Sequence, residues 1–159
     1  MSQKQRVAMQ LEPRIASQSD LVAIQEVIKD AYTPYVSSIG RKPGPLLDDY
    51  EALVKAGSVT VVDVDGAVRG ILVLIPEENA MLLDNVAVAA SAQGLGLGRE
   101  LIAYAEQRAR TAGYPLIRLY TNVAMTRNIE YYSRIGYEET HRAEQNGLKR
   151  VFMAKSLIK

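Results

Sequence analysis

The stretch Gln93-Gly94-Leu95-Gly96-Leu97-Gly98 places three glycines at every second position, between an apolar segment and a strong helix former. The segment before it (residues 84–89) reads as a strand, and the segment after it (residues 101–105) reads as a helix. Alternating glycines at a strand-to-helix turn let several backbone N–H groups converge, and the helix N-terminus adds partial positive charge. The sequence therefore predicts an anion site here, most often one for phosphate.

Two common nucleotide motifs do not fit this turn. The Walker pattern requires Gly-Lys-Ser/Thr, whereas Gly98 is followed by Arg99-Glu100. The Rossmann fingerprint spaces its glycines G-x-G-x-x-G and needs an acidic residue after the next strand, where this chain has Thr121-Asn122. Dinucleotide binding is therefore disfavoured. A flexible surface turn and a generic nucleotide-phosphate site remain as alternatives.

The glycine turn resembles the pyrophosphate loop of the GNAT superfamily of N-acetyltransferases, whose pattern is Gln/Arg-x-x-Gly-x-Gly/Ala. A second stretch, Asn128-Ile129-Glu130-Tyr131-Tyr132-Ser133-Arg134-Ile135-Gly136-Tyr137, resembles the family's Tyr-x-x-x-Gly-Phe/Tyr ending and puts Tyr132 at its tyrosine position. The resemblance covers most of the chain. It implies an acetyltransferase with acetyl-coenzyme A (acetyl-CoA) as co-substrate.

Periodicity along the chain predicts mixed α and β structure. Alternating and β-branched runs predict strands at residues 11–16, 59–64, 68–75, 80–89, 116–121, 137–142 and 149–156. Apolar residues at helical spacing predict helices at residues 21–31, 46–55, 95–112 and 125–135. Asp65-Gly66 and Asn146-Gly147 are hairpin turn signals.

This order of elements resembles that of the GNAT fold. The resemblance implies an α/β (α+β) domain with a mixed central sheet of about seven strands, flanked by about four helices. Its first half would be antiparallel, and the sheet would splay at strands 4 and 5. We expect a single acetyltransferase domain over residues 1–159, with residues 1–9 forming a frayed tail.

Composition excludes several classes of function. Nineteen basic and eighteen acidic residues give a net charge of +1, which is no electrostatic argument for nucleic acid or an anionic membrane. The chain has no Cys, so it cannot form disulfides or use a cysteine nucleophile. With a single His and no cluster at metal-ligand spacing, we expect no metal. Without an apolar stretch of membrane length or a signal-type N-terminus, we expect a cytoplasmic protein.

The resemblance implies cofactor contacts from the fourth strand, the glycine turn and the second motif, namely Val86, Ala87, Val88, Gln93, Gly94, Leu95, Gly96, Leu97, Gly98, Arg99, Asn128 and Tyr132. The family often has Asn seven residues before its tyrosine, on the pantetheine arm of coenzyme A (CoA). Here that position is Met125. Asn122 or Asn128 could contact the arm instead, and Asn128 is favoured because it shares a helix face with Tyr132.

The expected reaction is direct attack of a primary amine on acetyl-CoA in a ternary complex, with Tyr132 and Asp84 as catalytic residues. Asp84 lies two and four residues before Val86 and Val88, which predicts a shared strand face and a base acting directly or through water. Binding of a substrate cation is the alternative role for Asp84. A phenol pKa of ~10 exceeds a thiol pKa of ~8.5, so Tyr132 is expected to donate a hydrogen bond to the developing thiolate.

The acceptor is expected to contact the long segment between the first two helices, with Tyr32, Tyr35, Arg41 and Lys42 as candidates. A small-molecule or peptide amine would fit the resemblance, which also makes a homodimer plausible. His141 is expected to be structural or solvated. The alternative to an enzyme is a non-catalytic module of the same fold that binds acyl-CoA.

Overall fold

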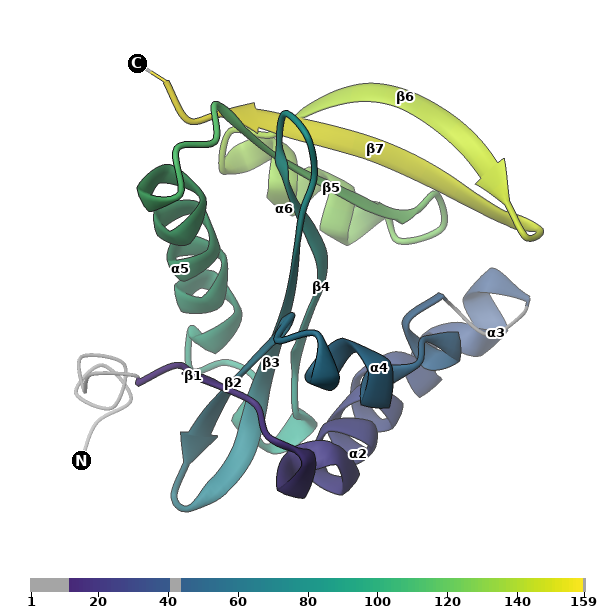
Figure 1. Cartoon of the computed structure of the whole chain (residues 1–159). Coiled ribbons are helices and arrows are strands. Elements are labelled where there is room, and N and C mark those ends of the chain that lie inside the picture. The colour runs from purple at the N-terminus through teal and green to yellow at the C-terminus, as the bar shows by residue number, and fades with distance from the viewer. Residues whose placement is uncertain (1–11, 41–43, 159) are drawn as a thin grey trace.

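One mixed sheet of seven strands runs through the computed structural model, which describes residues 12–40 and 44–158 (Figure 1). The strand order is β1-β2-β3-β4-β5-β7-β6, and only the β4–β5 pair is parallel. The strands are β1 Arg14–Ile15, β2 Val59–Val64, β3 Ala67–Pro76, β4 Met81–Val88, β5 Leu116–Asn122, β6 Glu138–Gln145 and β7 Leu148–Ser156. The predicted mixed sheet with an antiparallel first half is confirmed.

Helices cover both faces of the sheet and bury two separate apolar clusters. The helices are α2 Leu21–Tyr32, α3 Val36–Ile39, α4 Tyr50–Lys55, α5 Leu97–Thr111 and α6 Thr126–Arg134. One cluster joins α2 and α4 to the first strands, and the other joins α5 and α6 to the opposite face. Burial of these apolar faces supplies the main driving force for folding.

Helix α5 carries the predicted inward face, with all five of its members buried: Leu97, Leu101, Ile102, Ala105 and Ala109. Its first turn lies close against β3 because Gly70 has no side chain. A Cβ there would lie 3.0 Å from Leu101 Cδ1 and 3.1 Å from Leu97 Cδ2. This close approach brings the N-terminus of α5 to the end of β4.

Both predicted hairpin turns are present, with positive φ at Asp65 (53°) and Gly66 (82°) and at Asn146 (52°) and Gly147 (77°). The helix predicted at residues 46–55 begins only at Tyr50. The Asp49 side chain accepts from the Ala52 N–H (3.1 Å) and caps the helix there, while Gly44–Leu47 forms a separate 3₁₀ turn. The strand predicted at residues 11–16 is shorter among the described residues, where it covers Arg14–Ile15, after Pro13, which lacks a backbone N–H. The predicted tail lies outside the described ranges.

Strands β4 and β5 separate after a short paired segment. Their parallel pairing ends at Leu83↔Leu119. At the same level a bulge interrupts the β3–β4 ladder, since Leu74 pairs with Leu83 and Val73 with Asn85, which leaves Asp84 as the extra residue. The predicted splay between the fourth and fifth strands is thereby confirmed. It opens the sheet beside Asp84.

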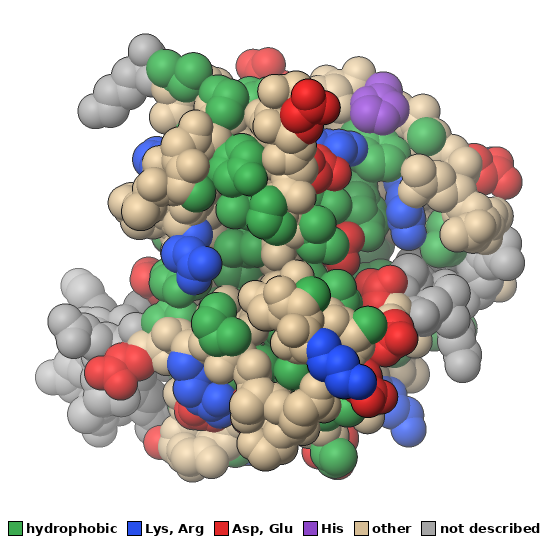
Figure 2. All heavy atoms as spheres, in the orientation of Figure 1, with side chains coloured by type: hydrophobic (Ala, Val, Ile, Leu, Met, Phe, Trp, Pro, Cys, Tyr) green, Lys and Arg blue, Asp and Glu red, His purple; other side chains and the backbone are tan. Residues whose placement is uncertain are grey.

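The surface shows no extended patch of one charge on the face drawn in Figure 2, where basic and acidic side chains are interspersed. Within residues 12–40 and 44–158, no helix has the length and hydropathy needed to cross a membrane. The same residues contain no group of three His, Asp or Glu side chains placed to hold a metal ion.

An ion pair joins the first strand to the start of α2 and predicts an acid-sensitive stability. Arg14 donates to both Asp20 oxygens (2.9 Å each), and this bonding holds the pKa of Asp20 at about 2, below its ordinary 3.8. Because the folded pKa is lowered, the stabilisation is present above pH ~4 and lost as pH falls toward 2. We expect Asp20→Asn to lower the free energy of unfolding by about 1–2 kcal/mol at pH 7, with the difference vanishing near pH 2.

Urea unfolding of both proteins between pH 2 and pH 7 measures this dependence. Asp63→Asn is the matched control, because Asp63 binds the same guanidinium (2.8 Å) but its side chain is 38% exposed. An exposed pair contributes little, so we expect a smaller effect from that variant. A pH-independent difference between Asp20→Asn and the parent would contradict the assignment.

Candidate active site

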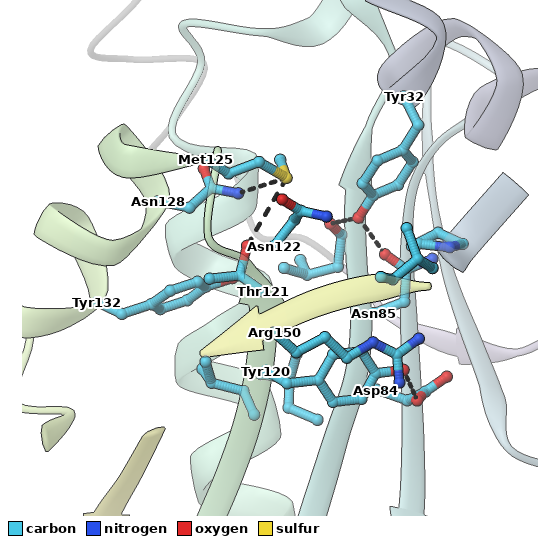
Figure 3. Close-up of a pocket in the computed structure, with 15 residues that line it drawn as sticks. Tyr32, Asp84, Asn85, Tyr120, Thr121, Asn122, Met125, Asn128, Tyr132 and Arg150 are labelled. Carbon is cyan, nitrogen blue, oxygen red and sulfur yellow. Dashed lines mark hydrogen bonds between the residues drawn. The ribbon is translucent and has the colours of Figure 1, made fainter. Parts of the chain in front are cut away.

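A cavity lies where β4 and β5 separate (Figure 3). Its walls come from both strands, from α6 and from two segments that arrive from distant parts of the sequence, the end of α2 and the start of β7. The lining residues are Tyr32, Pro45, Leu83, Asp84, Asn85, Val86, Leu119, Tyr120, Thr121, Asn122, Met125, Asn128, Tyr132, Leu148 and Arg150. The predicted catalytic residues Asp84 and Tyr132 therefore line the same cavity.

The exposed edge of β4 points its peptide groups into the gap. Ala89 donates its N–H to Arg69 on β3 (2.8 Å). Since alternate residues of a strand direct N–H and C=O to opposite sides, Val86 and Val88 direct theirs away from β3. Their carbonyls accept accordingly from side chains, Val86 from Tyr32 (3.2 Å) and Val88 from Gln93 (3.3 Å). The N–H groups of Val86 and Val88 are thus available to a ligand in the gap.

The glycine turn forms the N-terminal end of α5. Gly94 and Gly96 have φ values of 84° and 80°, a left-handed conformation that a side chain disfavours. Glu100 is the first residue whose N–H bonds back along the helix, to the Gly96 carbonyl (3.1 Å). The N–H groups of Leu97, Gly98 and Arg99 precede that bond and have no partner within the helix. Several donors therefore converge at a positive helix end, which suits a phosphate group.

Tyr132 is held in the apolar cluster with its ring packed edge-on against Tyr137 (centroids 5.7 Å apart) and tilted against Tyr131 (5.7 Å). The residue is 8% exposed, and its hydroxyl makes no hydrogen bond with the described residues. Burial raises the pKa of the Tyr132 phenol above its ordinary value of 10. The hydroxyl therefore remains protonated at neutral pH and can donate to a ligand in the cavity.

Both asparagines considered for the pantetheine arm line the cavity, on either side of Met125. The Asn122 carbonyl oxygen accepts from the Ala124 N–H (2.9 Å), which fixes that side chain in the turn after β5. The Asn128 amide lies 3.8 Å from the Met125 sulfur, and the Thr121 hydroxyl lies 3.7 Å from the same atom. A sulfur atom is a weak acceptor, so the Asn128 amide is the more readily released to a ligand.

Asp84 faces Tyr120 on the neighbouring strand. The Tyr120 hydroxyl donates to Asp84 Oδ1 (2.7 Å), and the Arg150 guanidinium lies over the Tyr120 ring (4.2 Å to the centroid). Burial and the negative Asp84 raise the pKa of Tyr120, which keeps its hydroxyl protonated as a donor. The bulge at Asp84 interrupts the strand alternation, so a shared face with Val86 and Val88 does not follow from spacing alone.

Asn85 is a site residue that sequence reasoning missed. Its amide donates to the Tyr50 hydroxyl (3.0 Å), and its carbonyl oxygen accepts from the Tyr32 hydroxyl. Tyr50 in turn donates to the Pro45 carbonyl (2.7 Å). This network ties β4 to the segments around α4. The signal that could have indicated it is a second polar residue, next to Asp84, inside an otherwise apolar strand.

Asp48 lies near this network and carries a perturbed carboxyl group. Burial and then the negative charge of Asp84 raise the pKa of Asp48 from 3.8 to about 6, while Arg150 opposes the shift. Asp48 lines a neighbouring hollow together with Tyr50, Lys29 and Gln25 rather than the cavity that holds Asp84. Pro45 lines the cavity that holds Asp84, whereas Leu46, Asp48 and Tyr50 line the neighbouring hollow.

The remaining predicted site residues are only partly brought together. Tyr32 lines the cavity, whereas Tyr35 is 37% exposed and does not. Arg41 and Lys42 lie outside the described residues. The Ala87 side chain is buried in the cluster under α2, so only its backbone could meet a ligand in the gap. His141 stacks on Phe152 (4.4 Å, 3° between the planes) and does not line the cavity.

Comparison with known proteins was made for sequence and for fold. The model of the Acetyltransferase (GNAT) family matches residues 22–137. No curated protein sequence matches the chain. Three solved structures, each below 25% identity, share the fold of this chain.

The ribosomal-protein-S18-alanine N-acetyltransferase of Escherichia coli has a TM-score of 0.69 at 15% identity, over 94% of this chain and 96% of that one. A protein of Salmonella typhimurium, solved with its cofactor acetyl-CoA, has a TM-score of 0.70 at 19% identity, over 94% and 95%. The PaiA N-acetyltransferase of Thermoplasma acidophilum, solved with CoA, has a TM-score of 0.70 at 18% identity, over 93% and 99%.

Proposed function

Since the chain belongs to the acetyltransferase (GNAT) family, we propose that it transfers the acetyl group of acetyl-CoA to a primary amine by direct attack in a ternary complex. The gap between β4 and β5 is the observation that carries this proposal. Tyr132 and Asp84 line the cavity at this gap, Val86 and Val88 direct their N–H groups away from β3, and the glycine turn offers further N–H groups at the start of α5. Similar folds have been solved with CoA or acetyl-CoA bound.

The glycine turn would hold the pyrophosphate of CoA, with N–H donors from Gly94 through Arg99 and the helix end behind them. The pantetheine arm would then run along β4, where Val86 and Val88 offer N–H groups and Asn128 an amide. A donor aimed at the thioester oxygen polarises the carbonyl and stabilises the charge that develops there. This arrangement fixes the reacting carbonyl beside Tyr132 and Asp84.

In the proposed step the amine nitrogen forms a bond to the thioester carbon while the carbon–sulfur bond breaks. The electron pair of that bond leaves on sulfur, and the products are an amide and the CoA thiol. The acceptor ammonium first loses a proton to Asp84, directly or through water. The Tyr132 hydroxyl donates a hydrogen bond to the sulfur as negative charge develops. As the amide forms, the nitrogen loses its second proton, and this proton balances the one that the thiolate takes up from Tyr132 or solvent late in the step.

A thiol-release assay with a panel of primary amines tests this function and the role of Asp84. We expect Asp84→Asn to lower kcat about 10²-fold, because the amide can neither accept the proton nor offset the charge of the ammonium. The KM for acetyl-CoA should stay within about threefold of the parent, since Asp84 lies on the acceptor side of the gap. Asp63→Asn, an exposed change on β2, should leave both constants unchanged.

The same assay separates the enzyme from a non-catalytic module. If acetyl-CoA protects the protein from thermal unfolding but no amine releases thiol, the chain is an acyl-CoA binding module of this fold. If ATP protects as well as CoA, the turn is a general phosphate site. A homodimer and a cytoplasmic location remain predictions from the sequence.

A further inference from the structure

Two opposite charges line the cavity without an ion-pair partner among residues 12–40 and 44–158. Asp84 comes from the bulge of β4, and Arg150 comes from the second half of the β6–β7 hairpin. No described Lys, Arg or His nitrogen lies within 4.0 Å of Asp84, and no described carboxylate lies within 4.0 Å of Arg150. Charged groups in a partly enclosed cavity are costly unless a partner satisfies them, which points to a charged ligand.

Three other arginines of the sheet are paired with carboxylates, although Arg69 on β3 has no such partner among the described residues. Arg118, on the same strand as Tyr120, binds Glu77 (2.9 Å), and Arg142 on β6 binds Glu139 (3.0 Å). Arg14 binds two carboxylates. Arg150 instead contacts neutral groups, since it lies over the Tyr120 ring and donates one N–H to the Gln145 side chain (2.6 Å). Its guanidinium therefore retains donors for an incoming group.

Neighbouring side chains hold the Arg150 guanidinium in one orientation. Register across the sheet sets Arg150 beside Asn122 at the end of β5, where the cavity begins. The Tyr120 ring supports one face of the guanidinium, and Gln145 fixes its in-plane rotation. A planar guanidinium held in this way matches the two oxygens of a carboxylate with two parallel N–H bonds.

Tyr120 sets the spacing between the two charges. Its hydroxyl contacts Asp84 and its ring face contacts Arg150, so the carboxylate and the guanidinium both lie against the Tyr120 side chain (Figure 3). Tyr120 occupies one oxygen of Asp84, which leaves the other for an ammonium group. A small molecule whose amino and carboxylate groups are separated by one or a few carbon atoms can reach both.

We propose that the acceptor is an amino-carboxylate, such as a free amino acid, with its ammonium on Asp84 and its carboxylate on Arg150. This inference rests on the proposed function and names the substrate class of that site. A diamine would place its second ammonium near Arg150, which lines the cavity and would repel it. Bidentate capture also explains why an arginine rather than a lysine lies over Tyr120.

The test compares each of a set of amino acids with its own carboxamide, which keeps the amine and removes the negative charge. We expect kcat/KM for the best amino acid to exceed that of its carboxamide about 10- to 100-fold, the effect of charge-assisted hydrogen bonds. Arg150→Gln should reduce this ratio to about one while acetylation of the carboxamide persists. Arg150→Lys keeps the charge but loses the paired donors, so it should retain only part of the ratio.

Arg118→Gln is the matched control, since Arg118 lies over the Phe152 ring (5.4 Å) but does not line the cavity. The control should keep the parent ratio. Equal rates for amino acids and carboxamides, a preference for diamines, or a ratio that survives Arg150→Gln would overturn the inference while leaving the acetyltransferase function in place. If no amine in the panel supports thiol release, the proposed function itself is overturned, and the inference with it.

Discussion

Replacement of Tyr132 by phenylalanine is expected to lower kcat about 10²-fold, while the Kd for acetyl-CoA changes less than about threefold. The hydroxyl makes no hydrogen bond with the described residues, so its proposed role is confined to the reaction, where sulfur gains negative charge. A donor that acts only on developing charge contributes to the transition state and little to ground-state binding. Steady-state kinetics together with calorimetric titration of CoA measures the two quantities.

The phenylalanine variant should also keep its fold, since the ring is what packs against Tyr131 and Tyr137. Tyr131→Phe is the matched control, because Tyr131 is the adjacent half-buried tyrosine and does not line the cavity. We expect unchanged kinetics and melting temperature from it. Full turnover in Tyr132→Phe would remove the tyrosine from the reaction.

Substitution of Gly96 by alanine is expected to raise the Kd for acetyl-CoA about 10- to 100-fold. Gly96 has a φ of 80° and is the N-cap residue of α5. It immediately precedes the N–H groups proposed to hold the pyrophosphate, so a methyl group here would compete with the ligand. The left-handed conformation adds about 1–2 kcal/mol of strain to an alanine. Relief of this strain would move the backbone N–H groups of the turn away from the positions that bind the ligand.

Gly113→Ala controls for strain, because Gly113 follows the other end of α5 and has a similar φ of 87°. Both variants should lose a similar amount of stability in thermal unfolding without ligand. Only Gly96→Ala should lose the additional stabilisation that acetyl-CoA provides. Equal responses of both variants to the ligand would show that the glycine turn does not bind it.

Local pattern was sufficient for most of the elements and for the conformation of the glycine turn. The hairpin turns at Asp65-Gly66 and Asn146-Gly147 follow from residues that tolerate positive φ. The inward face of α5 follows from the helical period, and the turn at Gly94 and Gly96 from glycine spacing. Each of these signals is written within a few consecutive residues, so no knowledge of distant contacts is needed to interpret them.

The boundaries that differed depend on single side chains. Residues 46–55 have helical spacing throughout, yet the helix starts at Tyr50 because the Asp49 carboxylate accepts a backbone N–H. Likewise, alternation along β4 predicts a common face for Asp84 and Val86, whereas the bulge places an extra residue there. Propensity and period describe the interior of an element better than its ends and irregularities.

By itself, the sequence determined the order of the strands and helices, the glycine turn at the head of α5 and the position of Tyr132 in its motif. Only the tertiary structure decided which side chains share the cavity. Arg150 reaches Tyr120 through the register of β7 on β5, and Asn85 meets Tyr32 and Tyr50 through the packing of α2 and α4 on β4. Contacts between residues far apart in the chain are set by sheet register and layer packing, which no local period encodes.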